Sequence, residues 1–204
     1  MKKLKDTRFL VQLAMLVALQ VILAATPLGY IRLVVMDLTI MHIPVLIGAI
    51  ALGPVAGGVL GTVFGITSLM TAISQPSLTN WPFNPVMTGS FYSVCIALIP
   101  RILVGVLAGW LFSVLIKTKM SQRVAAGLAA AAGSLCNTVL VLGGIYVLFG
   151  TRYSAELGIT PAILLTTIGG IVATNGLAEM AAAVVICVAL VTPLRSLGSS
   201  WSKK

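Results

Sequence analysis

Long apolar segments separated by short polar connections run through almost the whole chain. Six of them are predicted to be membrane-spanning helices, at residues 9–25, 38–52, 55–73, 88–116, 124–149 and 161–191. A helix crosses a bilayer with about 20 apolar residues, and all but the short second segment reach or approach that length. The pattern therefore predicts an all-α integral membrane protein with a single six-helix membrane domain over residues 1–204.

Prolines indicate where one of the connections lies. Two prolines within residues 81–85 exclude a regular helix there, so residues 74–87 are predicted to form the longest outer loop. This loop is uncharged, rich in hydrogen-bonding groups, and carries the aromatic residues Trp81 and Phe83. A lid over a binding site and an anchor at the depth of the lipid headgroups both fit that composition. The other outer loops are expected at residues 26–37 and 150–160.

Composition supports the membrane interpretation. Of the 204 residues, 59% are hydrophobic and 8% are charged, whereas about 25% of a soluble domain is charged. The net charge of +9 is concentrated at the ends of apolar segments, so we expect no nucleic-acid binding. The three cysteines lie inside apolar segments at no metal-ligand spacing. The sequence predicts neither a metal site nor a cofactor.

The placement of the basic residues predicts the topology. Ten of the 13 lysines and arginines precede the first span, separate the fourth from the fifth, or follow the sixth: Lys2, Lys3, Lys5, Arg8, Lys117, Lys119, Arg123, Arg195, Lys203 and Lys204. With six spans, these three groups fall on one side of the membrane. The positive-inside rule makes that side cytoplasmic, and the N- and C-termini with it.

Arg101 lies in the fourth span, about a dozen residues after its start. An arginine at the centre of a membrane helix costs about 2.5–3.5 kcal/mol on insertion scales. It is therefore expected to face a partner, a cavity or a ligand. Pro100 beside it removes one helix hydrogen bond and predicts a kink that helps to open a cavity.

Further polar residues occur in the last two spans. With a rise of about 1.5 Å per residue, Arg101, Asn137 and Asn175 reach similar depths near the middle of the bilayer, and Glu179 follows one turn later. One interpretation is an ion pair between Arg101 and Glu179 that joins two helices. The other is an outward-facing pocket in which an arginine fork binds a carboxylate. The candidate substrate-binding residues are Arg101, Asn137, Asn175, Glu179, Trp81, Phe83 and Asn84.

Enzymatic function is not expected. An intramembrane serine hydrolase would need Gly-x-Ser-Gly, but residues 88–90 read Thr-Gly-Ser, and His42 is the only histidine. The metalloprotease pattern His-Glu-x-x-His is absent. A stand-alone, proton-coupled small-solute transporter with an Arg101–Glu179 pair is an alternative. Against it, the two halves of the chain show no clear inverted repeat.

Small residues recur at the spacing of closely packed helices. The first span contains Ala14 and Ala18, and the third contains Gly57, Gly58, Gly61 and Gly65. Residues 43–48 read Ile-Pro-Val-Leu-Ile-Gly, and residues 52–58 read Leu-Gly-Pro-Val-Ala-Gly-Gly. With six spans and a proline-rich loop before a helix that contains an arginine, nearly the whole chain resembles the S components of energy-coupling factor (ECF) vitamin transporters.

This resemblance implies a substrate-binding subunit of an ABC importer in the bacterial cell membrane. It implies docking through Ala14 and Ala18 onto a transmembrane coupling subunit that works with two ATPase subunits. The chain has no Gly-x-x-x-x-Gly-Lys-Ser/Thr, so ATP hydrolysis is expected in those partners. The runs Phe83-Asn84-Pro85 and Ile43-Pro44 are most similar to the pantothenate-specific group. Folate, riboflavin or another micronutrient is the alternative substrate.

Overall fold

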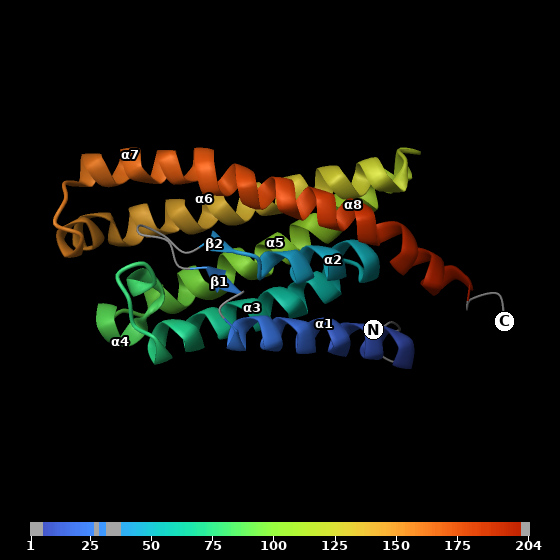
Figure 1. Ribbon diagram of the computed structural model, residues 1–204, viewed down its shortest axis with the longest axis horizontal. Helices are drawn as coiled ribbons and strands as arrows, with labels where there is room; N and C mark the ends of the chain where they lie inside the picture. Colours follow the sequence, from blue (N-terminus) through green and yellow to red (C-terminus); the bar gives the residue numbers. More distant parts are fainter. Residues whose placement is uncertain (1–5, 27–28, 32–37, 201–204) are drawn as a thin grey trace.

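The computed structural model describes residues 6–26, 29–31 and 38–200. Its long helices run along one axis and form a single bundle (Figure 1). The α-helices are α1 (Thr7–Ala25), α2 (His42–Leu52), α3 (Pro54–Ser74), α4 (Pro85–Thr88), α5 (Tyr92–Lys117), α6 (Gln122–Glu156), α7 (Pro161–Ile171) and α8 (Leu177–Ser200). A 3₁₀-helix, η2, covers Trp81–Phe83, and a π-helix, η3, covers Val172–Gly176. Strands β1 (Tyr30–Ile31) and β2 (Leu38–Thr39) pair antiparallel.

The predicted all-helical membrane class is confirmed in its main features. Among the described residues, five helical stretches are long and apolar enough to cross a membrane: α1, α3, α5, α6 and the continuous stretch Pro161–Leu190. The second predicted segment, 38–52, is helical only over the 11 residues of α2, because its first residues form the unpredicted strand β2. The second segment as a membrane span, and with it the count of six spans, therefore stays a prediction.

Three predicted helix ends were wrong. The fourth segment was expected to begin at residue 88, but Gly89 has a φ of 60° and separates α4 from α5. Such a left-handed conformation suits glycine and interrupts a helix. The outer loop expected at 150–160 is mostly helix, because α6 continues to Glu156. The sixth segment was expected to end at residue 191, but α8 continues through Pro193 to Ser200; neighbouring groups let membrane helices tolerate proline.

Glycines bring α3 and α5 into close contact, and this pair packs more extensively than any other pair of described helices. A Cβ atom added at Gly57 would overlap the backbone carbonyl of Gly105, and one added at Gly61 would overlap the carbonyl of Arg101. Missing side chains allow such backbone contact between helices. The predicted glycine face of the third span is therefore confirmed, and α5 is its partner.

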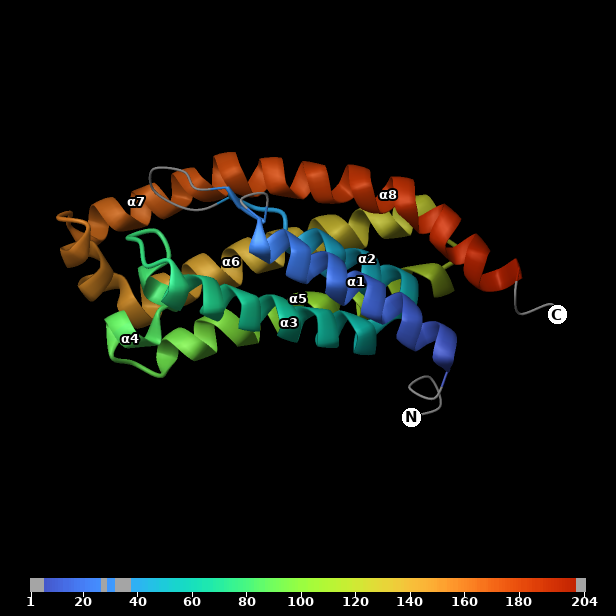
Figure 2. The same ribbon diagram turned by 60° about the horizontal axis from the view of Figure 1, so that its bottom comes forward.

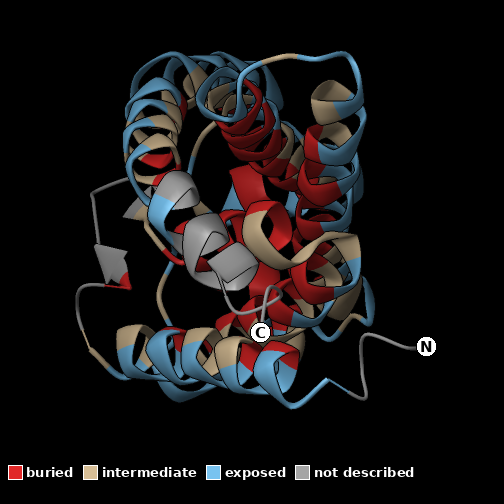
Figure 3. Cartoon of the chain, turned by 90° about the vertical axis from the view of Figure 1, so that its right-hand side faces the viewer, coloured by how far each residue is buried: buried red, intermediate tan, exposed pale blue. Residues whose placement is uncertain are grey.

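The outer surface of the bundle is largely apolar. Buried residues fill the interior and exposed residues face outward in the end-on view of Figure 3. Many of the exposed side chains are large and hydrophobic, among them Met15 (68% exposed), Phe91 (76%) and Val147 (79%). Apolar surface on this scale is the mark of a contact with lipid or another apolar partner.

Four chain segments meet at one end of the bundle, the right-hand end in Figures 1 and 2: the start of α1, the α2–α3 turn, the α5–α6 connection and the end of α8. Lys119 lies in the α5–α6 connection, and Lys117 and Arg123 lie beside it. They therefore share this end with Arg8. The other members of the basic groups lie outside the described residues or have undescribed side chains: Lys2, Lys3, Lys5, Arg195, Lys203 and Lys204.

Candidate substrate-binding site

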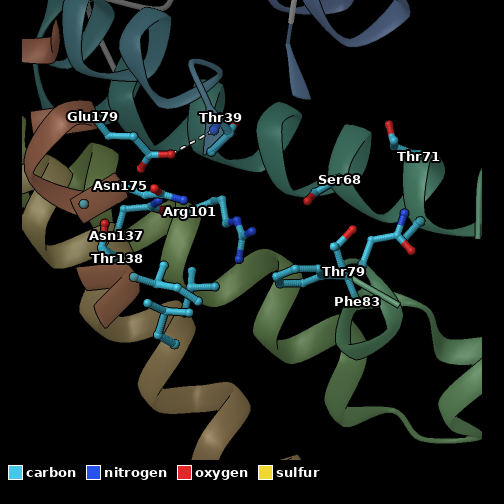
Figure 4. Close-up of a pocket in the computed structure, with 16 residues that line it drawn as sticks. Thr39, Ser68, Thr71, Thr79, Phe83, Arg101, Asn137, Thr138, Asn175 and Glu179 are labelled. Atoms are coloured by element: carbon cyan, nitrogen blue, oxygen red, sulfur yellow. Dashed lines mark hydrogen bonds between the residues drawn. The ribbon is translucent and has the colours of Figure 1, made fainter. Parts of the chain in front are cut away.

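A cavity lies between α3, α5, α6, the η3–α8 segment and the loop that follows α3 (Figure 4). The space in this cavity that the centre of a water molecule can occupy is about 80 Å³. On the same measure, one water molecule needs about 10–15 Å³. Polar and apolar side chains both line it: Thr39, Ser68, Thr71, Thr79, Asn80, Arg101, Asn137, Thr138, Asn175, Glu179, Ala72, Phe83, Val141, Leu142 and Ile171, together with Gly176.

Arg101 supplies the positive charge of the cavity. The side chain is only 5% exposed, and its Nη1 donates a hydrogen bond to the Ile96 carbonyl oxygen at 2.8 Å. The guanidinium carbon lies 4.7 Å from the ring centroid of Phe83 and 5.3 Å from that of Phe64. Contacts of this length attract a cation to an aromatic ring. Residues of α3, α5 and η2 thus surround one guanidinium.

Glu179 supplies a carboxylate to the same cavity from α8. Its Oε1 accepts a hydrogen bond of 2.8 Å from the backbone N–H of Thr39, shown as a dashed line in Figure 4. This bond connects the end of β2 to α8. Glu179 and Arg101 both line the cavity, and the hydrogen bonds described here direct them to Thr39 and Ile96 respectively.

Asn137 and Asn175 add amide groups. Asn137 is 5% exposed, and its Oδ1 is buried without a hydrogen-bond partner in the described part of the chain. A buried polar atom of this kind calls for a ligand or a water molecule. Asn175 lies in η3, and π-helical segments often occur at functional sites. The rise arithmetic therefore correctly brought Arg101, Asn137 and Asn175 to one place.

The three candidate residues of the loop after α3 have different surroundings. Phe83 lines the cavity, whereas Trp81 and Asn84 are not among the described residues that line it. Trp81 is 3% exposed and packs against the rings of Phe149 and Tyr153, at centroid distances of 5.7 and 5.8 Å. Since Trp81 is buried in protein, the interpretation of a lipid-facing anchor does not hold for it.

Asn84 fixes the shape of this loop. Its Nδ2 donates to the Ala72 carbonyl at 2.7 Å, while its Oδ1 accepts from the backbone N–H groups of Val86 and Met87. Asn84 is thus the N-cap of α4 and joins it to the last turns of α3. The loop is held over the cavity by these contacts and by those of Trp81.

Several residues of the cavity were missed by the sequence analysis. Ser68 and Thr71 lie three positions apart on α3, a polar pair on one helix face that the sequence did display. Asn80 is 6% exposed and folds the loop by donating to the Gln75 carbonyl at 2.8 Å. The contact of Thr39 is made by its backbone, so its side chain gave no signal.

Ala14 and Ala18, the predicted docking residues, lie on the exposed side of α1. The buried residues of that helix are Phe9, Leu13 and Gln20. The two alanines therefore face away from the bundle and away from the cavity.

The apolar spans and the cavity with its buried arginine define a membrane-embedded protein that binds a small molecule. The protein-family model for the substrate-specific component of ECF transporters matches residues 8–191 of the sequence. The chain therefore belongs to this family and is a multi-pass membrane protein. The chain is also 40% identical, over 162 residues, to the pantothenic acid transporter PanT of Lactococcus lactis subsp. cremoris (strain MG1363), with 76% of each chain covered. The resemblance found in the sequence motifs is thereby confirmed.

Proposed function

We propose that this chain binds pantothenate from outside the cell and delivers it to the other subunits of an ECF transporter. The buried Arg101, in a cavity that also contains two asparagine side chains, is the observation that carries the proposal. A bidentate, charge-assisted contact is the strongest that an arginine makes with a carboxylate. The relative named as a pantothenic acid transporter supports the choice of vitamin.

The chemistry of pantothenate fits the distribution of groups in the cavity. Its carboxylate would bind Arg101, and its hydroxyl and amide groups would bind Asn137, Asn175 and Glu179. Its geminal methyl groups would pack on apolar residues such as Val141. The buried Oδ1 of Asn137 would accept a hydrogen bond from one of the hydroxyl groups.

The topology and the partners are part of the same proposal. The chain crosses the membrane six times, with α2 as the short span and both termini in the cytoplasm. Clustering of Arg8, Lys117, Lys119 and Arg123 at one end of the bundle supports this orientation. The exposed face of α1 at Ala14 and Ala18 docks on a transmembrane coupling subunit, and two ATPase subunits supply the energy.

Calorimetric titration of the purified protein with pantothenate, folate and riboflavin, without ATP, tests the substrate. We expect submicromolar binding of pantothenate alone. Arg101→Ala should weaken it more than about tenfold, the loss expected when a hydrogen bond to a charged group is removed. Tight binding of another vitamin, or unchanged affinity in Arg101→Ala, would contradict the proposal.

The docking surface is tested separately. Ala14→Trp and Ala18→Trp should abolish vitamin uptake by cells that contain the coupling and ATPase subunits, while the titrated affinity stays unchanged. Both alanines are exposed on α1, so the variants should fold normally. Lost ligand binding in these variants would instead mean that this face packs within the protein.

A further inference from the structure

Pro100 and Arg101 are consecutive residues of α5. The backbone of Pro100 and the side chain of Arg101 are linked through the carbonyl group of a third residue, Ile96. In a regular α-helix, the carbonyl of Ile96 would accept a hydrogen bond from the N–H of residue 100. Proline has no N–H, so this carbonyl has no partner at the usual position. The acceptor of the 2.8 Å bond from Arg101 Nη1 is this same carbonyl oxygen.

We propose that Pro100 is a positioning residue for the ligand-binding cation of this protein. By withholding a backbone N–H, it leaves the Ile96 carbonyl to Arg101, and that bond fixes the direction of the guanidinium. The inference rests on the proposed function, because a fixed guanidinium matters only if it binds a carboxylate in the cavity. A guanidinium has five N–H donors in a rigid plane, so a bond at Nη1 sets the orientation of the whole fork.

The surroundings of Arg101 explain why one more contact is needed. The rings of Phe83 and Phe64 attract the cation, but cation–π attraction tolerates rotation of the guanidinium within its plane. Gly61 brings α3 against the backbone carbonyl of Arg101 and fixes the start of the side chain. The bond to Ile96 is a directional contact at the far end of the side chain, where ligand recognition is decided.

Substitution of Pro100 by alanine would restore a backbone N–H opposite the Ile96 carbonyl. The helix bond would then compete with Arg101 Nη1 for this oxygen. The arginine would stay buried and charged, but it would lose its preferred direction. The expected defect is therefore confined to ligands that carry a carboxylate.

The experiment compares pantothenate with pantothenol, in which a hydroxymethyl group replaces the carboxylate. Pro100→Ala should bind pantothenate about three- to tenfold more weakly, the range expected for the loss of one hydrogen bond. Its affinity for pantothenol should change less than about twofold. Pro193→Ala is the matched control, because Pro193 also lies within an apolar helix but does not line the cavity; it should leave both affinities unchanged.

A second variant shows whether Pro100 acts through Arg101. In an Arg101→Ala background, Pro100→Ala should have no further effect on pantothenate, because the group that it positions has been removed. Additive losses in the double variant, equal losses for the acid and the alcohol, or an unchanged affinity for pantothenate would each overturn the positioning role. A wild-type protein that binds the acid and the alcohol equally would overturn the carboxylate site itself, and so the proposed function.

Discussion

Two walls of the cavity are built in different ways. The α3–α5 wall, which includes η2, carries Arg101 and Phe83. In the apolar 18-residue stretch of each of these two long helices, 44% of the residues are buried. The α7–α8 wall carries Asn175 and Glu179 and is interrupted by η3, and only 22% of the residues in its apolar 18-residue stretch are buried. The cation thus sits on the densely packed wall, while the carboxylate and one amide sit on the sparsely packed one.

Glycine illustrates the difference. At Gly61, on the α3–α5 wall, a Cβ atom would overlap the backbone of Arg101. At Gly169 and Gly170, on the α7–α8 wall, a Cβ atom would meet nothing within 4 Å. Gly61 is buried and brings two backbones together, whereas Gly169 and Gly170 are exposed, so the open space beside them lies on the outer surface of the bundle. A buried charge needs the first arrangement, since loss of its contacts would leave it uncompensated.

The largest expected effect is at Gly61. Gly61→Leu should separate α3 from α5 and lower the free energy of unfolding by at least about 3 kcal/mol, because the clash is with backbone that cannot rotate away. Gly169→Leu, the matched control on the other wall, should not lower it, because the new side chain meets open space and replaces a glycine that disfavours the helix. Thermal and chemical unfolding in detergent measures both. Equal losses in the two variants would show that the walls do not differ in packing.

An intermediate effect is expected when the two charges are compared. Arg101→Ala should weaken pantothenate binding more than about tenfold. Glu179→Gln keeps a side-chain oxygen for the Thr39 N–H and removes a negative charge from the cavity that we propose binds an anion. Loss of repulsion then offsets any loss of hydrogen-bond strength, so the affinity should change less than about threefold. Calorimetric titration decides, and equal losses would show that the Glu179 carboxylate contributes to ligand binding as much as Arg101 does.

Some of this architecture was readable from single residues. Arg101 is a charge within an apolar segment, so its burial beside a cavity follows from the cost of exposing it to lipid. The rise per residue of an α-helix was enough to place Asn137 and Asn175 at the depth of Arg101. The glycine spacing predicted a close helix contact but not its partner, since any smooth face would fit the groove.

Other features depend on tertiary geometry that a local pattern does not carry. The hydrogen bond between Glu179 and Thr39 joins positions 140 residues apart. Its donor is the backbone N–H of Thr39, so the side chain of that residue does not predict the bond. Trp81 and Asn84 are residue types that often bind ligands, but in this structure their contacts hold the loop in place. Trp81 packs on Phe149 and Tyr153, and Asn84 donates to the Ala72 carbonyl. Most of the outer loop predicted at residues 26–37 lies outside the described part of the chain.

The smallest effect is expected at Gly170, and its sign sharpens the contrast between the walls. Gly170→Ala adds a methyl group where there is open space within α7, so it should raise the free energy of unfolding by about 0.5–1 kcal/mol through reduced backbone freedom. The same change at Gly65 should lower it, because the new Cβ atom would lie 2.8 Å from the Ala97 carbonyl oxygen. Chemical unfolding of both variants in one detergent measures the pair. If Gly170→Ala also destabilised the protein, the open space beside α7 would be needed by a neighbouring element, and the α7–α8 wall would have to be regarded as tightly packed.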